Sequence, residues 1–254
     1  MVQNERENQI LTLLKEQGYV DNLELSRKLE CSTVTIRTAM RNLEKQGLIA
    51  RTHGGAQLVA NTLTLSLSAG NIFKNNENKR KIAQQAYTYI NERDTIILDD
   101  SSNSFYLAQL IKEKKDKSLI VITNSLAIAC ELSGCDKTEV VLIGGLLGGG
   151  LPATMGETAL NTLRQFKADK GFIGVYGINP QIGITSIGHD QMLIKRLILE
   201  QAQEVYVLVG SEKFGDSCLS VAAPLSKVHR IITDRNIPAE YQRVTREQTL
   251  LDIV

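Results

Sequence analysis

The sequence predicts an α/β protein of two domains, a small helical domain followed by a larger one with a mostly parallel sheet. Its 254 residues, 43% of them hydrophobic, are enough for more than one core. From Lys79 onward, short apolar runs alternate with amphipathic segments. Before them, residues 60–78 shift sharply toward Ser, Thr and Asn. We therefore expect domains at 1–59 and 79–254, joined by a linker at 60–78.

Composition and charge narrow the possible function classes. Charged residues make up 22% of the chain and balance to a net +1, which is typical of a soluble globular protein and excludes a disordered one. The N-terminus lacks the basic end and apolar block of a signal peptide, and the uncharged run 140–156 is too rich in glycine for a spanning helix. We expect a soluble, cytoplasmic protein with no membrane partner.

The four cysteines predict no disulfide framework, no metal site and no cofactor. They are few and scattered, and Cys130 and Cys135 have no nearby histidine to complete a zinc site. We expect reduced, structural thiols. A redox switch at this pair is an alternative that requires an exposed thiol in an electropositive setting, whereas Cys130 has apolar neighbours in the sequence.

Two helices are expected before residue 30. Residues 4–17 carry apolar side chains mostly on one helical face, and Gly18 follows where a helix would end. A short extended stretch fits residues 19–20. Asp21 then begins a second helix through a pattern like a capping box. The expected apolar stripe of this helix consists of Leu23, Leu25 and Leu29.

A third helix has the features of one that reads DNA. The Ser32 hydroxyl can cap its start, and Ile36, Met40 and Leu43 recur at i, i+4 and i+7, so they face inward. Short polar and guanidinium groups are left facing outward: Thr33, Thr35, Arg37, Thr38 and Arg41. The order helix, tight turn, helix is that of a helix-turn-helix motif, whose second helix enters the major groove.

Basic residues concentrate around this third helix. Residues 26–53 contain six Lys or Arg and two Glu, a local excess of +4 in a nearly neutral chain. Such an excess is an electrostatic footprint for nucleic acid. A solvated helix face would show the same charge, and the spacing of the apolar residues favours the DNA-binding interpretation.

A hairpin is expected directly after the third helix. Predicted strands at 48–53 and 56–59 are joined at Gly54-Gly55, a two-residue turn signal. Such a hairpin is a wing, from which Arg51 and His53 can reach phosphate or the minor groove. His53 can equally be a surface turn residue. The predicted contacts with double-stranded DNA are Ser32, Thr33, Thr35, Arg37, Thr38, Arg41, Arg51 and His53.

The larger domain is expected to be a parallel sheet covered on both faces. Near-continuous apolar runs lie at 95–98, 119–122, 140–143, 171–174, 205–209 and 230–233. Helical segments separate them at 79–92, 103–115, 125–134, 157–166 and 188–203. This alternation is typical of a Rossmann-like fold, which binds ligands at the carboxyl ends of its strands.

Polar groups and glycines follow these strands. Ser102 and Asn103 open a helix, where free N–H groups favour an anion such as phosphate, and Asn124-Ser125 repeats the pattern after the next strand. Each residue alone is also an ordinary helix cap, but their convergence at one sheet edge predicts a pocket for a small phosphorylated metabolite. The expected effector-binding residues are Asp99, Ser102, Asn103, Asn124, Ser125, Gly144, Gly145, Lys195 and Lys213.

Three motifs of the N-terminal domain carry a family resemblance. They are Ser-Thr-Val-Thr-Ile-Arg at 32–37, Leu-Glu-Lys-Gln-Gly at 43–47 and Arg-Thr-His-Gly-Gly-Ala at 51–56. They resemble the N-terminal domain of the DeoR family of bacterial transcriptional repressors. After Thr-Ile-Arg the family usually has Arg-Asp-Leu, whereas this chain has Thr-Ala-Met at 38–40. Arg37 therefore matches the family, and the second arginine of the motif is absent.

The larger domain carries further motifs of this kind, such as Val-Ile-Thr-Asn-Ser at 121–125, Leu-Ile-Gly-Gly at 142–145 and Lys-Phe-Gly at 213–215. They resemble the DeoR effector domain, which is similar in fold to ribose-5-phosphate isomerases. The resemblance implies a homo-oligomeric repressor, dimer or tetramer, of a carbohydrate or polyol operon, released from its operator by a phosphorylated sugar or polyol. One departure is at 99–104, where Asp-Ala-Gly-Ser-Thr-Thr becomes Asp-Asp-Ser-Ser-Asn-Ser, so Asp100 adds a negative charge.

The alternative from another class is a sugar-phosphate isomerase with an appended DNA-binding domain. Proton transfer between neighbouring carbons requires a positioned base, and related isomerases carry acids in the loop after the fourth strand. Here that loop, 174–179, contains no carboxylate. We therefore expect a sensor without catalytic residues rather than an enzyme.

Overall fold

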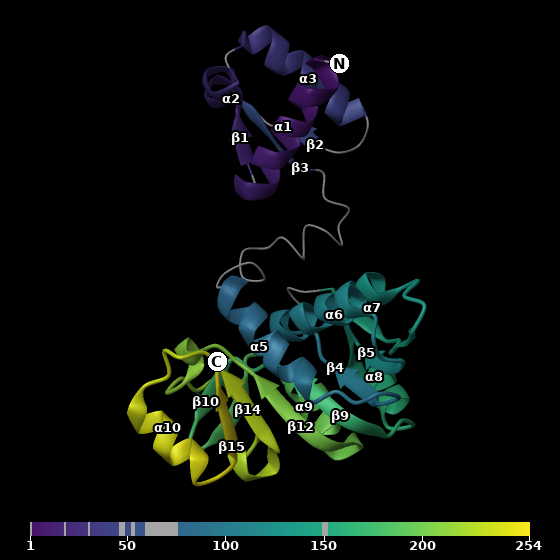
Figure 1. The fold of residues 1–254 in the computed structure, drawn as a ribbon, viewed down its shortest axis with the longest axis vertical. Helices are drawn as coiled ribbons and strands as arrows, with labels where there is room; N and C mark the ends of the chain where they lie inside the picture. Colours follow the sequence, from purple (N-terminus) through teal and green to yellow (C-terminus); the bar gives the residue numbers. More distant parts are fainter. Residues whose placement is uncertain are drawn as a thin grey trace. The chain divides into compact units, whose positions relative to one another are not determined.

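The computed structural model describes residues 2–17, 19–29, 31–45, 49–51, 54–58, 76–148 and 152–254 (Figure 1). The chain divides into two compact units, residues 1–69 and 70–254. Helix α5 begins at Asn76, inside the segment that the composition marks as a linker. The rest of that segment, 60–75, lies outside the described residues.

The first unit consists of three helices and a small antiparallel sheet. The helices are α1 (Val2–Gln17), α2 (Asn22–Lys28) and α3 (Thr33–Lys45). The strands β1 (Tyr19–Asp21), β2 (Ile49–Arg51) and β3 (Gly55–Leu58) pair in the order β1-β3-β2. The predicted inward residues of α3, Ile36, Met40 and Leu43, are fully buried against Ile10 and Leu14 of α1. The expected helices and the inward face of α3 are therefore confirmed.

The predicted apolar stripe of α2 is wrong at one position. Leu25 is buried as expected and Leu29 packs against the core from a half-buried position, but Leu23 is 61% exposed. Leu23 is the second residue of α2, two positions after the capping Asp21, and it lies on the outward side of the first turn. Helix α2 therefore contributes Leu25 to the core, and Leu29, directly after the helix, adds a partly buried contact.

The predicted two-residue turn at Gly54-Gly55 is also wrong. Arg51 pairs with Ala56, and Gly55 lies within β3, opposite Asp21 of β1. A side chain at Gly55 would collide with the carbonyl oxygen of Val20 and the ring of Tyr19. Glycine is needed here because two strands approach closely, not because the chain reverses.

The start of α2 provides a first testable prediction. Asp21 Oδ1 accepts hydrogen bonds from the N–H groups of Leu23 (2.7 Å) and Glu24 (3.2 Å). Asp21→Ala is expected to lower the free energy of unfolding by about 1 kcal/mol, because two helical N–H groups lose their acceptor. Chemical denaturation measures this, with Asp21→Asn as the control that keeps an acceptor oxygen. An equal loss in both variants would contradict the capping role.

The second unit is built on a seven-stranded sheet in the order β15-β14-β12-β9-β4-β5-β6. The strands are β4 (Thr95–Leu98), β5 (Leu119–Thr123), β6 (Thr138–Leu142), β9 (Ala168–Ile173), β12 (Ala202–Leu208), β14 (Arg230–Thr233) and β15 (Leu250–Ile253). All neighbouring pairs in it are parallel. The predicted parallel sheet is confirmed, and β15 is an additional edge strand that the sequence pattern did not predict.

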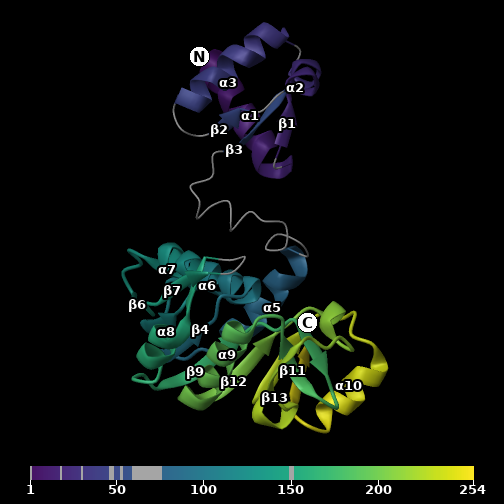
Figure 2. The same cartoon turned by 180° about the vertical axis from the view of Figure 1, so that it is seen from behind.

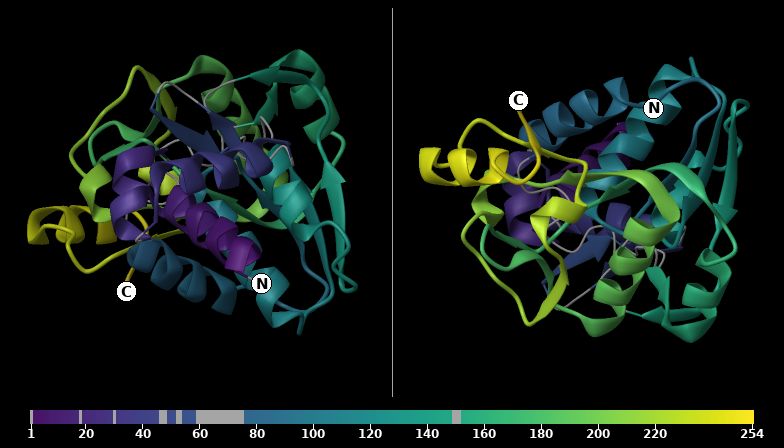
Figure 3. Two further views of the ribbon diagram at one scale, coloured as in Figure 1. Left: turned by 90° about the horizontal axis from the view of Figure 1, so that it is seen from above. Right: turned by 90° about the horizontal axis from the view of Figure 1, so that it is seen from below.

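Helices cover both faces of this sheet, and a small second sheet packs against a helix on one of the faces. The helices α5 (Asn76–Thr88), α6 (Ser102–Lys114) and α7 (Leu126–Leu132) lie on one face, and α8 (Gly156–Leu163) and α9 (His189–Gln201) on the other (Figures 1 and 2). Helix α10 (Ala239–Arg246) lies at the β15 end (Figure 3). Smaller strands form the β7-β8 hairpin (Leu146–Gly148, Ala153–Met155) and the sheet of β10 (Gly177–Asn179), β11 (Gly183–Ser186) and β13 (Ser220–Ala223).

The strand order places a switch point in the middle of the sheet. From β4 the chain moves outward through β5 to β6, and from β9 it moves outward in the opposite direction through β12, β14 and β15. Strands β4 and β9 are neighbours, so the connections that follow them diverge. In parallel sheets a crevice for ligands forms at this point, outside the carboxyl ends of the strands.

Candidate functional site

Helix α3 presents a polar face that is built as the sequence predicts. Ser32 Oγ accepts a hydrogen bond from the Thr35 N–H (3.2 Å) and lies 2.8 Å from Thr35 Oγ1. Arg37 and Arg41 are exposed. Thr38 is exposed too, while Thr33 and Thr35 are half-buried at the first turn. The face therefore carries two exposed guanidinium groups on a helix whose start is capped.

One exposed residue of this face escaped the sequence analysis. Val34 is 68% exposed, and its carbonyl accepts a hydrogen bond from Thr38 Oγ1 (3.0 Å). An exposed apolar side chain beside arginines can contact a thymine methyl group in the major groove. The signal was available, because Val34 is two residues from the buried Ile36 and so faces away from the core.

The wing residues are only partly placed. Arg51 lies in β2, where its backbone pairs with Ala56. His53 lies outside the described residues, so its expected DNA contact stays a prediction.

At the switch point of the second unit, Asp99 follows β4 and is completely buried. Its Oδ1 accepts from the Ser101 N–H (3.1 Å) and Ser104 Oγ (2.6 Å). Its Oδ2 accepts from the Gly174 N–H (3.0 Å) after β9 and from Lys195 Nζ (2.5 Å) on α9. Asp99 thus links the loop after β4 and the loop after β9 to helix α9 on one face of the sheet.

The effector contact of Lys195 stays a prediction, but the structure shows that its positive charge is already paired. Its ammonium group is buried and forms an ion pair with Asp99. Burial lowers the pKa of Lys195, but attraction to Asp99 and Asp100 outweighs this and holds the pKa above its ordinary value. Lys195 stays charged, and its charge is matched by two carboxylates within the protein.

Asp100 is buried beside this pair, and the list of expected site residues did not include it. Its Oδ2 accepts a long hydrogen bond from Gln191 Nε2 (3.4 Å) on α9. Burial raises the pKa of Asp100, attraction to Lys195 lowers it and repulsion from Asp99 raises it, so the pKa lies above the ordinary range. The sequence did carry a signal for Gln191. A helix that leads into a parallel strand starts at the carboxyl edge, so the first turn of α9 had to lie here.

The start of α6 lies at the same place. Ser101 caps the helix by accepting from the Ser104 N–H (3.2 Å), and helix geometry leaves the Ser102 and Asn103 N–H groups without an acceptor in α6. Asn103 Nδ2 donates to the Leu208 carbonyl at the end of β12 (2.7 Å), whereas its Oδ1 is buried without a partner. Both predicted residues therefore open the helix at the switch point, as expected.

The predicted residues after β5 are largely occupied by local structure. Ser125 Oγ accepts from the Ile128 N–H and caps α7 (3.4 Å). Asn124 Nδ2 donates to the Thr154 carbonyl (3.1 Å), and the Thr154 N–H donates back to the Asn124 carbonyl (2.8 Å). Both residues are buried, so they hold the β7-β8 hairpin against the sheet edge.

The remaining predicted residues lie in the loops after β6 and β12. Gly144 and Gly145 are exposed, and a side chain at Gly145 would lie 2.7 Å from the Met155 carbonyl oxygen. Gly145 is thus required for close approach of the β7-β8 hairpin. Lys213 is half-buried in a single 3₁₀ turn, Ser211–Lys213, after β12.

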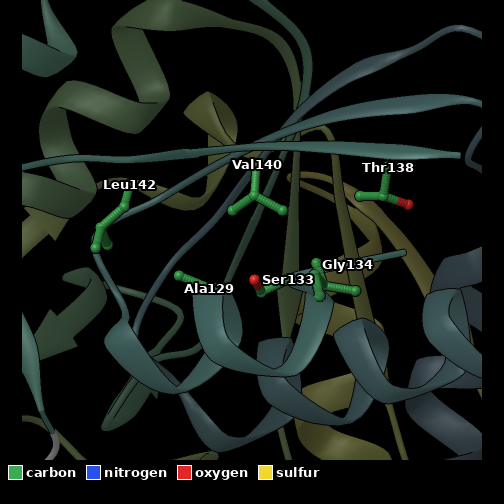
Figure 4. Close-up of a pocket in the computed structure, with 7 residues that line it drawn as sticks. Ala129, Ser133, Gly134, Thr138, Val140 and Leu142 are labelled. Atoms are coloured by element: carbon green, nitrogen blue, oxygen red, sulfur yellow. The ribbon is translucent and has the colours of Figure 1, made fainter. Parts of the chain in front are cut away.

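Among the described residues, an open surface hollow lies away from the switch point. It has a volume of about 320 Å³ and lies between α7 and the edge strand β6. Ala129, Val140 and Leu142 line it together with other uncharged residues (Figure 4). None of the expected effector-binding residues contributes to it. No charged side chain is among its lining residues, so it lacks a cation that would attract a phosphate.

The sequence interpretation of Cys130 needs a correction. Its neighbours Ile128 and Leu132 are buried, but Cys130 itself is exposed on α7, because it occupies the outward side of the helix between them. All four cysteines are free thiols. Within the described ranges, no three His, Cys, Asp or Glu residues gather to hold a metal ion, and no helix is long and apolar enough to cross a membrane.

Comparison with known proteins identifies the domain family of both units. The model of the DeoR-like helix-turn-helix domain matches residues 6–62, and that of the DeoR C-terminal sensor domain matches residues 74–235. The chain belongs to the DeoR family. It therefore combines the family's DNA-binding domain with its sensor domain, and the expected fold of both is confirmed.

Relatives of the DeoR protein described here are similar over nearly its whole length. A putative aga operon transcriptional repressor of Escherichia coli O157:H7 is 32% identical, covering 93% of this chain and 88% of its own. The glycerol-3-phosphate regulon repressor of Escherichia coli K12 is 29% identical, covering 96% of each chain. A solved ribose 5-phosphate isomerase A of Methanocaldococcus jannaschii is 16% identical, covering 56% of this chain and 55% of its own, with a TM-score of 0.42.

Proposed function

We propose that this DeoR-family protein represses a carbohydrate or polyol operon and leaves its operator when a small sugar or polyol metabolite binds the second unit. The observation that carries the proposal is the exposed Arg37 and Arg41 face of α3 in a chain that also contains a sensor domain. The curated relatives named above are repressors of an aga operon and of a glycerol-3-phosphate regulon.

The DNA contact is proposed for the capped start of α3 and the wing. A guanidinium group can form two hydrogen bonds with guanine or contact a phosphate, and short hydroxyl side chains beside it allow close approach. Arg37 and Arg41 are one helical turn apart and share a face. Arg51 and His53 are proposed to contact the backbone or the minor groove.

We propose that the protein acts as a homo-oligomer. One recognition helix contacts too few base pairs to find a single site in a genome, so paired half-sites are expected about one helical turn apart. Leu146 and Leu147 are 72% and 57% exposed beside the edge strand β6, and such apolar groups favour contact with a second copy.

The effector is proposed to bind at the switch point, over Asp99, Ser102 and Asn103. Binding can release the DNA only if the effector prefers one arrangement of the protein over the other. The loop after β9 contains Gly174, Val175 and Tyr176 but no carboxylate. This composition favours sensing over isomerisation.

The proposal is tested by selecting duplexes from a random pool with the purified chain. The affinity for the enriched duplex is then measured by fluorescence anisotropy, with and without a panel of sugars, polyols and their phosphates. We expect a specific sequence to be enriched, and at least one panel member to weaken its binding about tenfold or more. Failure to enrich any sequence, or turnover of ribose 5-phosphate that Asp99→Asn abolishes, would contradict it.

A further inference from the structure

We propose that Asp100 and the amide oxygen of Asn103 form a hydroxyl-binding subsite at the switch point, from which a phosphate group is excluded. This inference rests on the proposed function, because it names the part of the effector that this edge of the sheet accepts. It replaces the expectation that the start of α6 holds a phosphate.

The first step concerns charge. Asp99, Asp100 and Lys195 lie together at the carboxyl edge of the sheet, and when all three are ionised they sum to −1. Lys195 is paired with Asp99 at 2.5 Å, so its positive charge is already matched. Lys213 follows β12, two strands from β4, which is roughly 10 Å across the sheet. At a pH where Asp100 is ionised, a phosphate over the end of β4 would therefore meet a net negative charge at close range.

The second step concerns hydrogen bonds. Asn103 is 9% exposed, and its Oδ1 is buried with no partner in the described part of the chain. The hydrogen bond that Asp100 Oδ2 accepts from the side chain of Gln191 is long, at 3.4 Å. A buried acceptor without a good donor is unfavourable, so both groups favour a ligand that donates hydrogen bonds. A phosphate dianion donates none.

The third step explains why the donating group of the ligand is a hydroxyl rather than an ammonium group. The Ser102 and Asn103 N–H groups open α6, and the positive end of a helix disfavours a cation. A neutral group that donates to Asp100 and Asn103 while accepting from the N–H groups satisfies all of these partners. Adjacent hydroxyls of a sugar or polyol have this property.

The decisive experiment measures the affinity for inorganic phosphate by isothermal titration calorimetry on the full chain. We expect Asp100→Asn to bind phosphate at least about tenfold more tightly than the wild type, because the repelling charge is removed while the side-chain shape is kept. Asp136→Asn is the matched control, since Asp136 is exposed just before β6. Equal phosphate affinity in the wild type and Asp100→Asn would overturn the proposal.

A second measurement uses matched pairs, glycerol with glycerol 3-phosphate and glucose with glucose 6-phosphate. The Tm shift of the wild type should be at least as large with the unphosphorylated member, and Asp100→Asn should reverse this order. Larger shifts with the phosphates in both proteins would overturn the proposal. Asp100→Ser makes the same comparison if Asp100→Asn does not fold.

The operator assay separates this proposal from the proposed function. If a phosphate binds the wild type tightly and releases the DNA, the proposed function holds and the role of Asp100 is wrong. If Asp100→Asn gains phosphate binding but no ligand changes operator affinity, the role of Asp100 holds and the sensor mechanism is wrong.

Discussion

Replacing Lys195 by methionine is expected to lower the free energy of unfolding of the sensor unit by about 3–5 kcal/mol. Lys195 Nζ lies 2.5 Å from Asp99 Oδ2, and both side chains are almost completely buried. Methionine fills much of the same volume but leaves the Asp99 carboxylate without its cation, with Asp100 beside it. Chemical denaturation followed by far-ultraviolet circular dichroism measures the loss.

Two further variants define the origin of that loss. Lys170→Met breaks a comparably buried pair, Lys170 with Asp94 at 2.6 Å, at the opposite end of the strands. It should cost a similar free energy of unfolding without altering the response to sugars or polyols. Adding Asp99→Asn to Lys195→Met should recover part of the stability, because the unpaired charge is removed. A loss below 1 kcal/mol in Lys195→Met would show that the ion pair does not hold the switch point together.

Replacing Arg37 by alanine is expected to weaken operator binding by about 1–3 kcal/mol, roughly 5- to 150-fold, if the guanidinium group reads a base. If it contacts a phosphate instead, the loss should be nearly uniform across sequences, and the slope of log K against log salt should become shallower by about 1. Fluorescence anisotropy at several salt concentrations separates the two roles.

The control for this prediction is an arginine far from α3. Arg164 of the second unit is exposed and pairs only with surface groups, Glu157 and Asn161. Arg164→Ala removes the same charge from the chain. Neither variant should shift the Tm appreciably, since both side chains are at the surface. Unchanged operator affinity in Arg37→Ala would mean that α3 is not the recognition helix.

Central strands and amphipathic helices of this protein can be predicted from sequence because each has a strong local pattern. The carboxyl-terminal halves of β4, β5, β9 and β12 are buried and appear as short apolar runs, although β9 has Asp169 and Lys170 near its start and β12 has Gln203 and Glu204. Edge strand β15 breaks this pattern with Asp252, whose charge is matched by Arg230 of β14 at 2.5 Å and whose carboxylate also accepts hydrogen bonds from Gln85 of α5 and from Tyr89 just after that helix. Arg230 is 22 residues away from Asp252 in the sequence.

Prediction of the candidate site from the sequence has the same limit, because ion pairs between distant residues leave no local pattern. Sequence order indicates that Asp99, Ser102 and Asn103 lie at the carboxyl edge of the sheet, because each follows the end of a strand. It does not indicate that Lys195, 96 residues after Asp99, is already paired. A charged group is available to a ligand only if the folded protein leaves it without a partner of opposite charge. The spacing of residues along the chain does not show which partners the fold brings to it.

The close approach at Gly55 bears on how the wing meets its target. Gly55 is held against Val20, and the Asn22 N–H at the start of α2 donates to the Gly54 carbonyl (2.9 Å). The start of β3 is therefore anchored to strand β1 and to the first residue of α2 before any duplex arrives. A module whose parts are already fixed gives up less freedom on docking, so operator recognition by these residues should resemble the fit of a preformed template more than the folding of a loop around DNA.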